Sequence, residues 1–363
     1  MTKPIKFCRW ILQDKMECYT SSDSDSESGS KTLDLSYLML DTNVLNEHFL
    51  CTNSPENLDT LLLYQNRLST IPYSIVRFIN LTTLDVSNCG LNELPHFLGD
   101  LSISCLIAKN NNLTNNSLPK CFENLLGLRE LNLSGNRLTE FPEQILDLVD
   151  LKFLYLGGNC ISEINKDLWK LQRLQVLSMG GNRLMEVPST LGRCTALQAL
   201  VLCDNMLESL PSSISNLKNL KSLSLHKNHL RTLPTEIITL KNLTELSLRD
   251  NPLVVRFVSD MTHDPPALLE LAARVVKSND ITYDDEGIPR NLIEYLNSGH
   301  RCVNVNCQGI FFDNRVEHVK FVDFCGKYRL PLLQYLCSSK CIDPRDGEEE
   351  MVSGAMIRKV LLG

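Results

Sequence analysis

Four cysteines near the C-terminal end form two close pairs, and this pattern is the most direct sign of chemistry in the sequence. Four residues separate Cys302 from Cys307, and three separate Cys337 from Cys341. Two such pairs can supply the four thiolates of a tetrahedral zinc site, with sulfur atoms about 2.3 Å from the metal. The segment between the pairs is too small to fold on a core of its own, so we predict a structural, non-catalytic zinc ion.

Other assignments of these cysteines fit the sequence as well. Cys325 is a spare thiol in the same segment, and His300 or His318 could replace one ligand. Neither pair has the tighter C-x-x-C spacing, and cysteines without metal also pack as small apolar groups. A further hypothesis is a redox or metal sensor, in which thiol state or metal supply changes the binding of partners.

Composition and motifs limit the classes of function. The 14 cysteines show no pairing scheme, the first residues hold no apolar run long enough for a signal peptide, and no segment could span a bilayer, so we expect reduced thiols in the cytoplasm or also the nucleus. A net charge of −7 argues against a nucleic-acid or membrane partner. Without a phosphate-binding glycine loop, an H-E-x-x-H helix or a nucleophile elbow, we expect a non-catalytic protein.

An internal sequence repeat determines most of the secondary structure that must position these cysteines. The pattern L-x-x-L-x-L-x-x-N occurs ten times at intervals of about 23 residues, which is the signature of leucine-rich repeats. Its last position, here called the ladder position, falls at Asn43, Asn66, Cys89, Asn111, Asn136, Asn159, Asn182, Asn205, Asn228 and Asn251. Because stacked repeats bury a continuous column of leucines, we expect an α/β fold, a right-handed solenoid with a parallel concave sheet.

Each repeat predicts a strand, a turn and a returning convex segment. In L-R-E-L-N-L-S-G-N, Leu128, Leu131 and Leu133 face inward, and the Asn136 amide can bond to the backbone of the neighbouring repeat. At the ladder position Cys89, the thiol can still donate a weak hydrogen bond. Pairs such as Phe141-Pro142 begin the convex segment, where no ladder donor is needed.

The outward strand positions predict a protein-binding concave surface. The two outward columns begin at Tyr37 and Met39 in the first repeat. In the middle of the array the large apolar members are Phe153, Tyr155, Val176 and Val201. Glycines at positions 157, 158, 180 and 181 leave bare backbone beside them, so we predict a docking patch for a protein substrate. The alternative is that these are ordinary exposed apolar residues.

A helical pattern, P-A-L-L-E-L-A-A-R-V-V, replaces the repeat after Asn251. Its simplest interpretation is a cap that covers the end of the leucine column. The side chains that would face the column are Leu268, Leu271, Ala272 and Val275.

Residues 267–298 also resemble the suppressor-of-cytokine-signalling box, by which substrate receptors attach to elongin C, elongin B and a cullin. That family has a small residue, two spaced leucines, a second small residue and an aliphatic residue at helical spacing. The matching residues, which the resemblance implies bind elongin C, are Ala267, Leu268, Leu271, Ala272 and Val276. The second half of the motif implies cullin-binding residues at Ile288, Pro289, Leu292, Tyr295 and Leu296.

The box departs from the family pattern at several places. Ala272 replaces the usual cysteine, and Arg274 lies one place after the usual arginine. Glu286 and Gly287 stand where the cullin-5 form has its first Leu-Pro pair, so the box is more similar to a cullin-2 box, and both cullins stay open.

Together, the repeats, the box and the Cys-rich segment are similar to a family of leucine-rich repeat proteins over residues 33–341. The resemblance implies a substrate receptor of a cullin-RING ubiquitin ligase, which holds a protein substrate near the charged conjugating enzyme. The alternative is a leucine-rich repeat scaffold in Ras or phosphatase signalling, whose C-terminal helix is only a cap.

We therefore expect five segments. An acidic, Ser-rich and partly disordered leader would be followed by the solenoid, a helical box, a Cys-rich module and a flexible tail. Their expected bounds are residues 1–30, 31–258, 259–299, 300–345 and 346–363.

Overall fold

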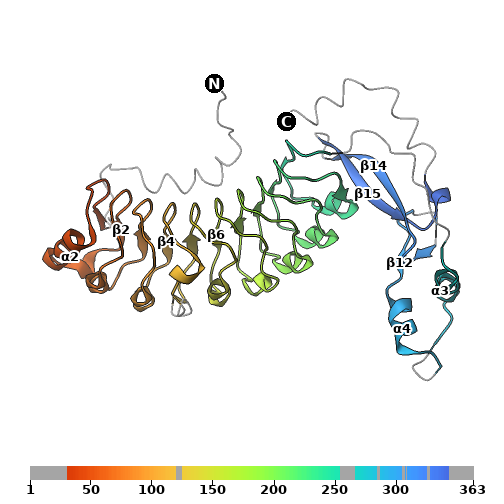
Figure 1. Ribbon diagram of the computed structural model, residues 1–363, viewed down its shortest axis with the longest axis horizontal. Coiled ribbons are helices and arrows are strands. Elements are labelled where there is room, and N and C mark those ends of the chain that lie inside the picture. Colours follow the sequence, from red (N-terminus) through yellow and green to blue (C-terminus); the bar gives the residue numbers. More distant parts are fainter. Residues whose placement is uncertain are drawn as a thin grey trace.

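The computed structural model describes residues 31–119, 125–253, 266–283, 287–304, 307, 309–324 and 328–342. The predictions for the leader and the tail, and Cys325, lie outside the described residues. Figure 1 shows a curved array of repeats that ends in a smaller module built from the C-terminal part of the chain.

The concave face of the array is a ten-stranded parallel sheet, which confirms the predicted solenoid. Each strand is only three residues long, because the chain must turn at the ladder position that follows. In spatial order the strands are β1 (Thr32–Asp34), β2 (Thr60–Leu62), β3 (Thr83–Asp85), β4 (Cys105–Ile107), β5 (Glu130–Asn132), β6 (Phe153–Tyr155), β7 (Val176–Ser178), β8 (Ala199–Val201), β9 (Ser222–Ser224) and β11 (Glu245–Ser247).

Short 3-10 helices form most of the convex side. A proline stands immediately before six of them, as the Leu-Pro and Phe-Pro pairs predict, because its fixed φ suits the start of a helix and no ladder donor is lost. The short 3-10 helices of the array, with and without a preceding proline, are η3 (Pro55–Asn57), η4 (Tyr73–Arg77), η5 (His96–Asp100), η6 (Asn115–Ser117), η8 (Glu143–Asp147), η9 (Leu168–Lys170), η10 (Ser189–Arg193), η11 (Ser212–Asn216) and η12 (Thr235–Thr239).

The ladder residues join neighbouring repeats through buried hydrogen bonds. Asn159 donates from Nδ2 to the carbonyls of Leu133 and Leu156, both at 3.0 Å, and accepts at Oδ1 from the N–H of Leu138 at 3.0 Å. The thiol of Cys89 donates to a carbonyl of the preceding repeat at 3.1 Å. Since an unsatisfied buried amide costs about 1–3 kcal/mol, these side chains fix the spacing of the repeats.

The first repeat departs from the predicted register. Its strand is β1 (Thr32–Asp34), so the outward positions predicted at Tyr37 and Met39 are wrong, and so is the ladder position at Asn43. Asn43 lies exposed in helix α2 (Thr42–Cys51), which an aspartate side chain caps by accepting two backbone N–H groups. This longer helix replaces the usual convex segment and lengthens the repeat, which shifts the pattern.

A β-hairpin, and not the predicted helix, covers the C-terminal end of the leucine column. Strands β14 (Val316–Phe324) and β15 (Tyr328–Leu336) are antiparallel, and β15 pairs in parallel with β10 (Leu233–Pro234) of the last repeats. Leu330 and Leu332 are buried in the same core as the repeat leucines. The Cys-rich segment therefore shares its core with the solenoid.

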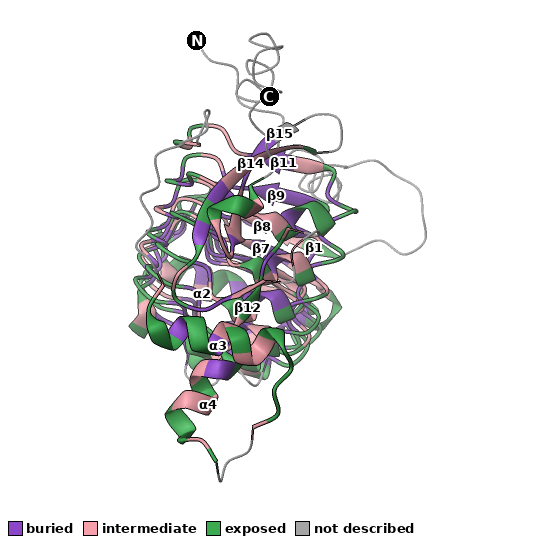
Figure 2. Cartoon of the chain, turned by 90° about the vertical axis from the view of Figure 1, so that its right-hand side faces the viewer, coloured by how far each residue is buried: buried purple, intermediate pink, exposed green. Residues whose placement is uncertain are grey.

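The prediction that a helix caps the leucine column is therefore wrong. Helix α3 (Leu268–Ser278) forms, but Leu268, Leu271, Ala272 and Val275 are exposed. Figure 2, which looks onto this end of the molecule, shows exposed residues along α3. The remaining elements of this end are α4 (Arg290–Asn297), β12 (His300–Arg301), β13 (Ile310–Phe311) and η13 (Ser339–Cys341).

Candidate functional site

The four predicted metal ligands lie together. The sulfur atoms of Cys302, Cys307, Cys337 and Cys341 are all within 4.8 Å of one another. The Cys337 sulfur lies 3.5 Å from the sulfur of Cys307 and 3.5 Å from that of Cys341. A tetrahedral ion with bonds of about 2.3 Å would hold its sulfur ligands about 3.8 Å apart. The four-cysteine cluster therefore fits one metal ion with little movement of the chain.

Tight turns place these cysteines. The Cys302 N–H donates to the carbonyl of Gly309 at 2.8 Å, and the Gly309 N–H donates to the Cys307 sulfur at 3.2 Å. A Cβ at Gly309 would lie 2.5 Å from the Cys337 sulfur, so a side chain at this position would collide with the cluster. Asn304 joins the two pairs by donating its side-chain amide to the Cys341 carbonyl at 2.7 Å.

The local environment favours one thiolate and disfavours the others. The backbone N–H of Gly309 lowers the pKa of Cys307, whereas burial raises the pKa of Cys337 and of Cys341. Four thiolates at this separation need a cation to offset their repulsion. Among the described residues the cluster consists of these four cysteines, and neither His300 nor His318 belongs to it.

Helix α3 carries an apolar stripe that faces solvent. This α3 stripe consists of Ala267, Leu268, Leu271, Ala272 and Val275, and all five residues are exposed. Leu268 keeps 83% of its surface accessible. Neighbouring exposed apolar side chains of this kind are characteristic of protein-interaction sites. Four of the five predicted elongin-binding residues lie on this stripe, whereas Val276 packs inward against the small core beneath α3.

The opposite face of α3 is anchored by an ion pair that was not predicted from the sequence. The Glu270 carboxylate, 2% exposed, accepts from Arg274 Nε at 3.0 Å and from the N–H groups of Phe312 and Asn314 at 3.2 and 2.8 Å. Arg274 also donates to the carbonyls of Cys337 and Asn314 at 3.0 and 2.6 Å. The i,i+4 spacing of the pair was the available signal, but it did not reveal the distant partners.

Acid is expected to weaken this anchor only at unusually low pH. Although burial alone raises the pKa of Glu270, hydrogen bonds from Arg274, Asn314 and Phe312 hold it below its ordinary value of 4.5. Because the folded-state pKa is lowered, the carboxylate stabilises the docked helix above the unfolded pKa, and this contribution is lost as pH falls through the folded pKa.

Carbon NMR titration of the Glu270 carboxyl measures this directly. We expect a midpoint below 4.5, followed by the amide shifts of Phe312 and Asn314. In a Glu270→Gln variant these two amides should not titrate in that range. A wild-type midpoint at or above 4.5 would contradict the contacts described above.

The predicted cullin-binding residues do not share one surface. Leu296 is buried with Ala273 and Phe312 in the small core beneath α3. Tyr295 stacks on Phe312, with ring centroids 4.9 Å apart, and is half-buried. Pro289 is exposed immediately before α4, and Ile288 and Leu292 are half-buried. This set therefore combines residues that hold α4 in place with residues that solvent can reach.

The predicted concave patch is brought together in part. Tyr155, Val176 and Ala199 form a cluster against which Phe153 packs, while Val201 lies beside it, half-buried. Burial raises the pKa of the Tyr155 hydroxyl. The glycines beside the cluster allow close approach of adjacent turns, because a Cβ at Gly180 would lie 2.7 Å from the Cys203 sulfur. Because Tyr155 and Val176 are buried, less of the predicted docking patch faces solvent than the sequence indicated.

Comparisons with known proteins match the repeats and most of the chain. A leucine-rich repeat region model matches residues 139–248, and two further leucine-rich repeat models match residues 107–161 and 80–101. Leucine-rich repeat-containing protein 58 of Xenopus laevis is 59% identical over 345 residues, which are 92% of this chain and 98% of that protein. The chain belongs to the leucine-rich repeat-containing protein 58 family. The Xenopus tropicalis protein of that name is 51% identical, over 86% of this chain and 89% of its own.

Solved structures support the fold of this leucine-rich repeat-containing protein 58 homologue. A functional domain of InlJ from Listeria monocytogenes superposes with a TM-score of 0.50 at 21% identity, over 62% of this chain and 45% of that chain. This likeness shows the fold alone. The matched models are all leucine-rich repeat models, which is the architecture of a protein-interaction scaffold. No helix in the described part of the chain combines the length and apolarity needed to cross a bilayer.

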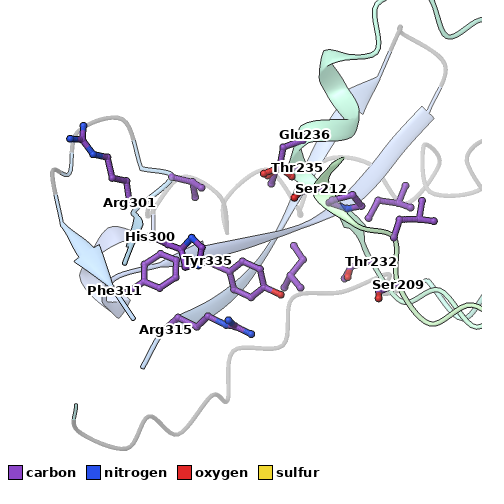
Figure 3. Close-up of a pocket in the computed structure, with 15 residues that line it drawn as sticks. Ser209, Ser212, Thr232, Thr235, Glu236, His300, Arg301, Phe311, Arg315 and Tyr335 are labelled. Carbon is purple, nitrogen blue, oxygen red and sulfur yellow. The ribbon is translucent and has the colours of Figure 1, made fainter. Parts of the chain in front are cut away.

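A cavity of about 390 Å³ lies where the last repeats of this family member meet the C-terminal module. Figure 3 shows Arg315 and Tyr335 side by side on the module side, and the Arg315 guanidinium lies 4.3 Å from the centre of the Tyr335 ring. The repeats contribute hydroxyl groups, including those of Ser212 and Thr235. No sequence motif indicated this cavity, because its walls come from segments far apart in the chain.

Proposed function

We propose that the protein is the substrate-recognition subunit of a cullin-RING ubiquitin ligase, which attaches through elongin C and elongin B to cullin-2 or cullin-5. The observation that carries this proposal is the α3 stripe. A scaffold whose C-terminal helix is only a cap has no need of apolar residues that face solvent, and here the hairpin covers the column instead. The stripe has the helical spacing of a ridge that enters a groove on a partner.

In this proposal the concave patch holds a protein substrate. Phe153 and Val201 are half-buried and partly accessible to a partner, whereas Tyr155 and Val176 are buried in the cluster beside them. Aromatic side chains in such positions often contribute much of a protein interface's binding energy. The receptor itself catalyses no reaction. It holds the bound substrate near the conjugating enzyme, which raises the effective concentration of the substrate there. The proposed compartment is the cytoplasm, with the nucleus as a second one, and the proposed cofactor is one structural zinc ion.

Affinity capture of the full chain tests this function. We expect the wild type to recover elongin B, elongin C and one of the two cullins, which would also decide the cullin class. A Phe153→Ala, Tyr155→Ala variant should keep these adaptor proteins and lose the captured substrates. Absence of elongins from the wild type would leave the plain scaffold as the function. Retention of every other captured protein by the double variant would remove the concave patch as the substrate site.

A further inference from the structure

The exposed α3 stripe and the partly buried four-cysteine cluster are joined by one short chain of hydrogen bonds. Arg274, on the inner face of α3, donates from Nη1 to the carbonyl of Cys337 at 3.0 Å. The same guanidinium pairs with Glu270, whose two oxygens accept the backbone N–H groups of Phe312 and Asn314. Phe312 and Asn314 lie between the two cysteine pairs in the sequence. Besides the small core beneath it, α3 is therefore held by a hydrogen bond to a cysteine of the cluster and by two residues of the segment between the cysteine pairs.

The cluster is joined equally closely to the last repeats. Cys337 directly follows Leu336, the last residue of β15. Earlier in the same strand, Leu330 and Leu332 are buried in the solenoid core, and Leu332 pairs with Leu233 of β10. One cysteine thus stands between the strand that enters the solenoid and the arginine that holds α3.

Among the residues that the structure describes, few side chains besides the cysteines close this part of the module. The buried apolar residues around the sulfur atoms are Val316 and Leu336, with Cys302 completing a small core. Such a core buries too little apolar surface to define a fixed geometry alone. A metal ion bound by four thiolates would supply the missing stability, since the free energy of binding becomes folding energy in small metal centres.

We infer that a zinc ion bound by Cys302, Cys307, Cys337 and Cys341 is the joint that holds the α3 stripe in a fixed position on the last repeats, so that presentation of the stripe to its partner depends on the metal. Four sulfur ligands in a compact arrangement favour zinc among the divalent ions of the cell, and iron is the competing occupant. The inference rests on the proposed function only for the identity of the partner, elongin C.

Metal analysis and hydrogen exchange of the full chain test the joint. We expect about one zinc per wild-type chain, as a closed four-thiolate site holds one ion. A Cys307→Ser, Cys341→Ser variant should lose the metal, and amide exchange in residues 268–278 should become at least about tenfold faster. Exchange in β5 to β8 should not change. A Cys51→Ser, Cys160→Ser variant, altered at cysteines outside the cluster, should match the wild type in both measurements.

An Arg274→Leu variant separates metal binding from its consequence. This variant keeps all four cysteines, so it should retain zinc while α3 loses its protection from exchange. It also serves if the double cysteine variant fails to fold. Unchanged exchange of α3 in Arg274→Leu and in the zinc-free protein would overturn the inference, as would iron or no metal in the wild type.

Binding of purified elongin C and elongin B separates this inference from the proposed function. Metal-dependent protection of α3 without any elongin binding would refute the function and keep the joint. Equal elongin binding by the wild type and the metal-free variant would keep the function and refute the joint. Both stand if the wild type binds the elongins and the metal-free variant binds them at least about tenfold more weakly.

Discussion

Replacing Leu268 by arginine together with Ala272 by phenylalanine is expected to abolish capture of elongin C. Leu268 is 83% exposed and Ala272 lies on the same exposed stripe, so neither substitution disturbs the core of the module. A charge placed in an apolar groove and a ring in the place of a methyl group would each oppose docking. Loss of a central apolar anchor costs about 2–4 kcal/mol, so affinity should fall at least about 30-fold.

Affinity capture beside a matched surface variant measures this effect. Met185 is another large apolar residue, 65% exposed on the repeats, and a Met185→Arg variant should capture the elongins like the wild type. Hydrogen exchange of residues 268–278 should be unchanged in the double variant, which would show that α3 still forms. Equal elongin capture by the wild type and the double variant would show that the adaptor-binding site does not lie on α3.

Truncation of Leu332 to alanine is expected to loosen the C-terminal end of the solenoid. This side chain is 1% exposed and lies in the core shared by β15 and the repeats. Removing a buried leucine side chain costs about 2–5 kcal/mol, through lost transfer energy and the cavity left behind. Because the hairpin covers the last leucines, this cost should fall on β9, β11 and the module more than on the first repeats.

Native-state hydrogen exchange reports this loss repeat by repeat. We expect the opening free energy of the β11 amides to fall by about 2–5 kcal/mol in Leu332→Ala, and that of the β2 amides to stay unchanged. The neighbouring Leu333 is only half-buried, so Leu333→Ala should have a smaller effect on β11. Equal effects of the two variants would show that the hairpin does not cover the end of the column.

The repeats were predictable because their signal is local and recurs. Every leucine of the pattern and every ladder residue from Asn66 onward has its role decided within one unit and its neighbour. The first unit was mispredicted because helix α2 (Thr42–Cys51) replaces its convex segment, and Asn43 happens to match the pattern within that helix.

The cap could not be predicted, because two apolar segments competed for the same surface. The helical pattern with Leu268 and Leu271 and the strand pattern with Leu330 and Leu332 are both able to cover a leucine column. The choice depends on which segment can also add a strand beside β10, and no periodicity in the sequence carries that information. The four-cysteine cluster was predictable because thiol spacing directly limits ligand geometry, whereas the contacts of Arg274 link residues too far apart in sequence.

The shared core of β15 and the last repeats also defines where the molecule tolerates a change of length. A repeat inserted beyond β11 would separate β10 from its strand partner, whereas a repeat duplicated between β8 and β9 would meet neighbours of its own kind on both sides. Each rung added there would carry Tyr155 and its neighbours about 5 Å further from α3. The number of interior repeats therefore sets the distance between the concave patch and α3. This number can change without altering either end of the array.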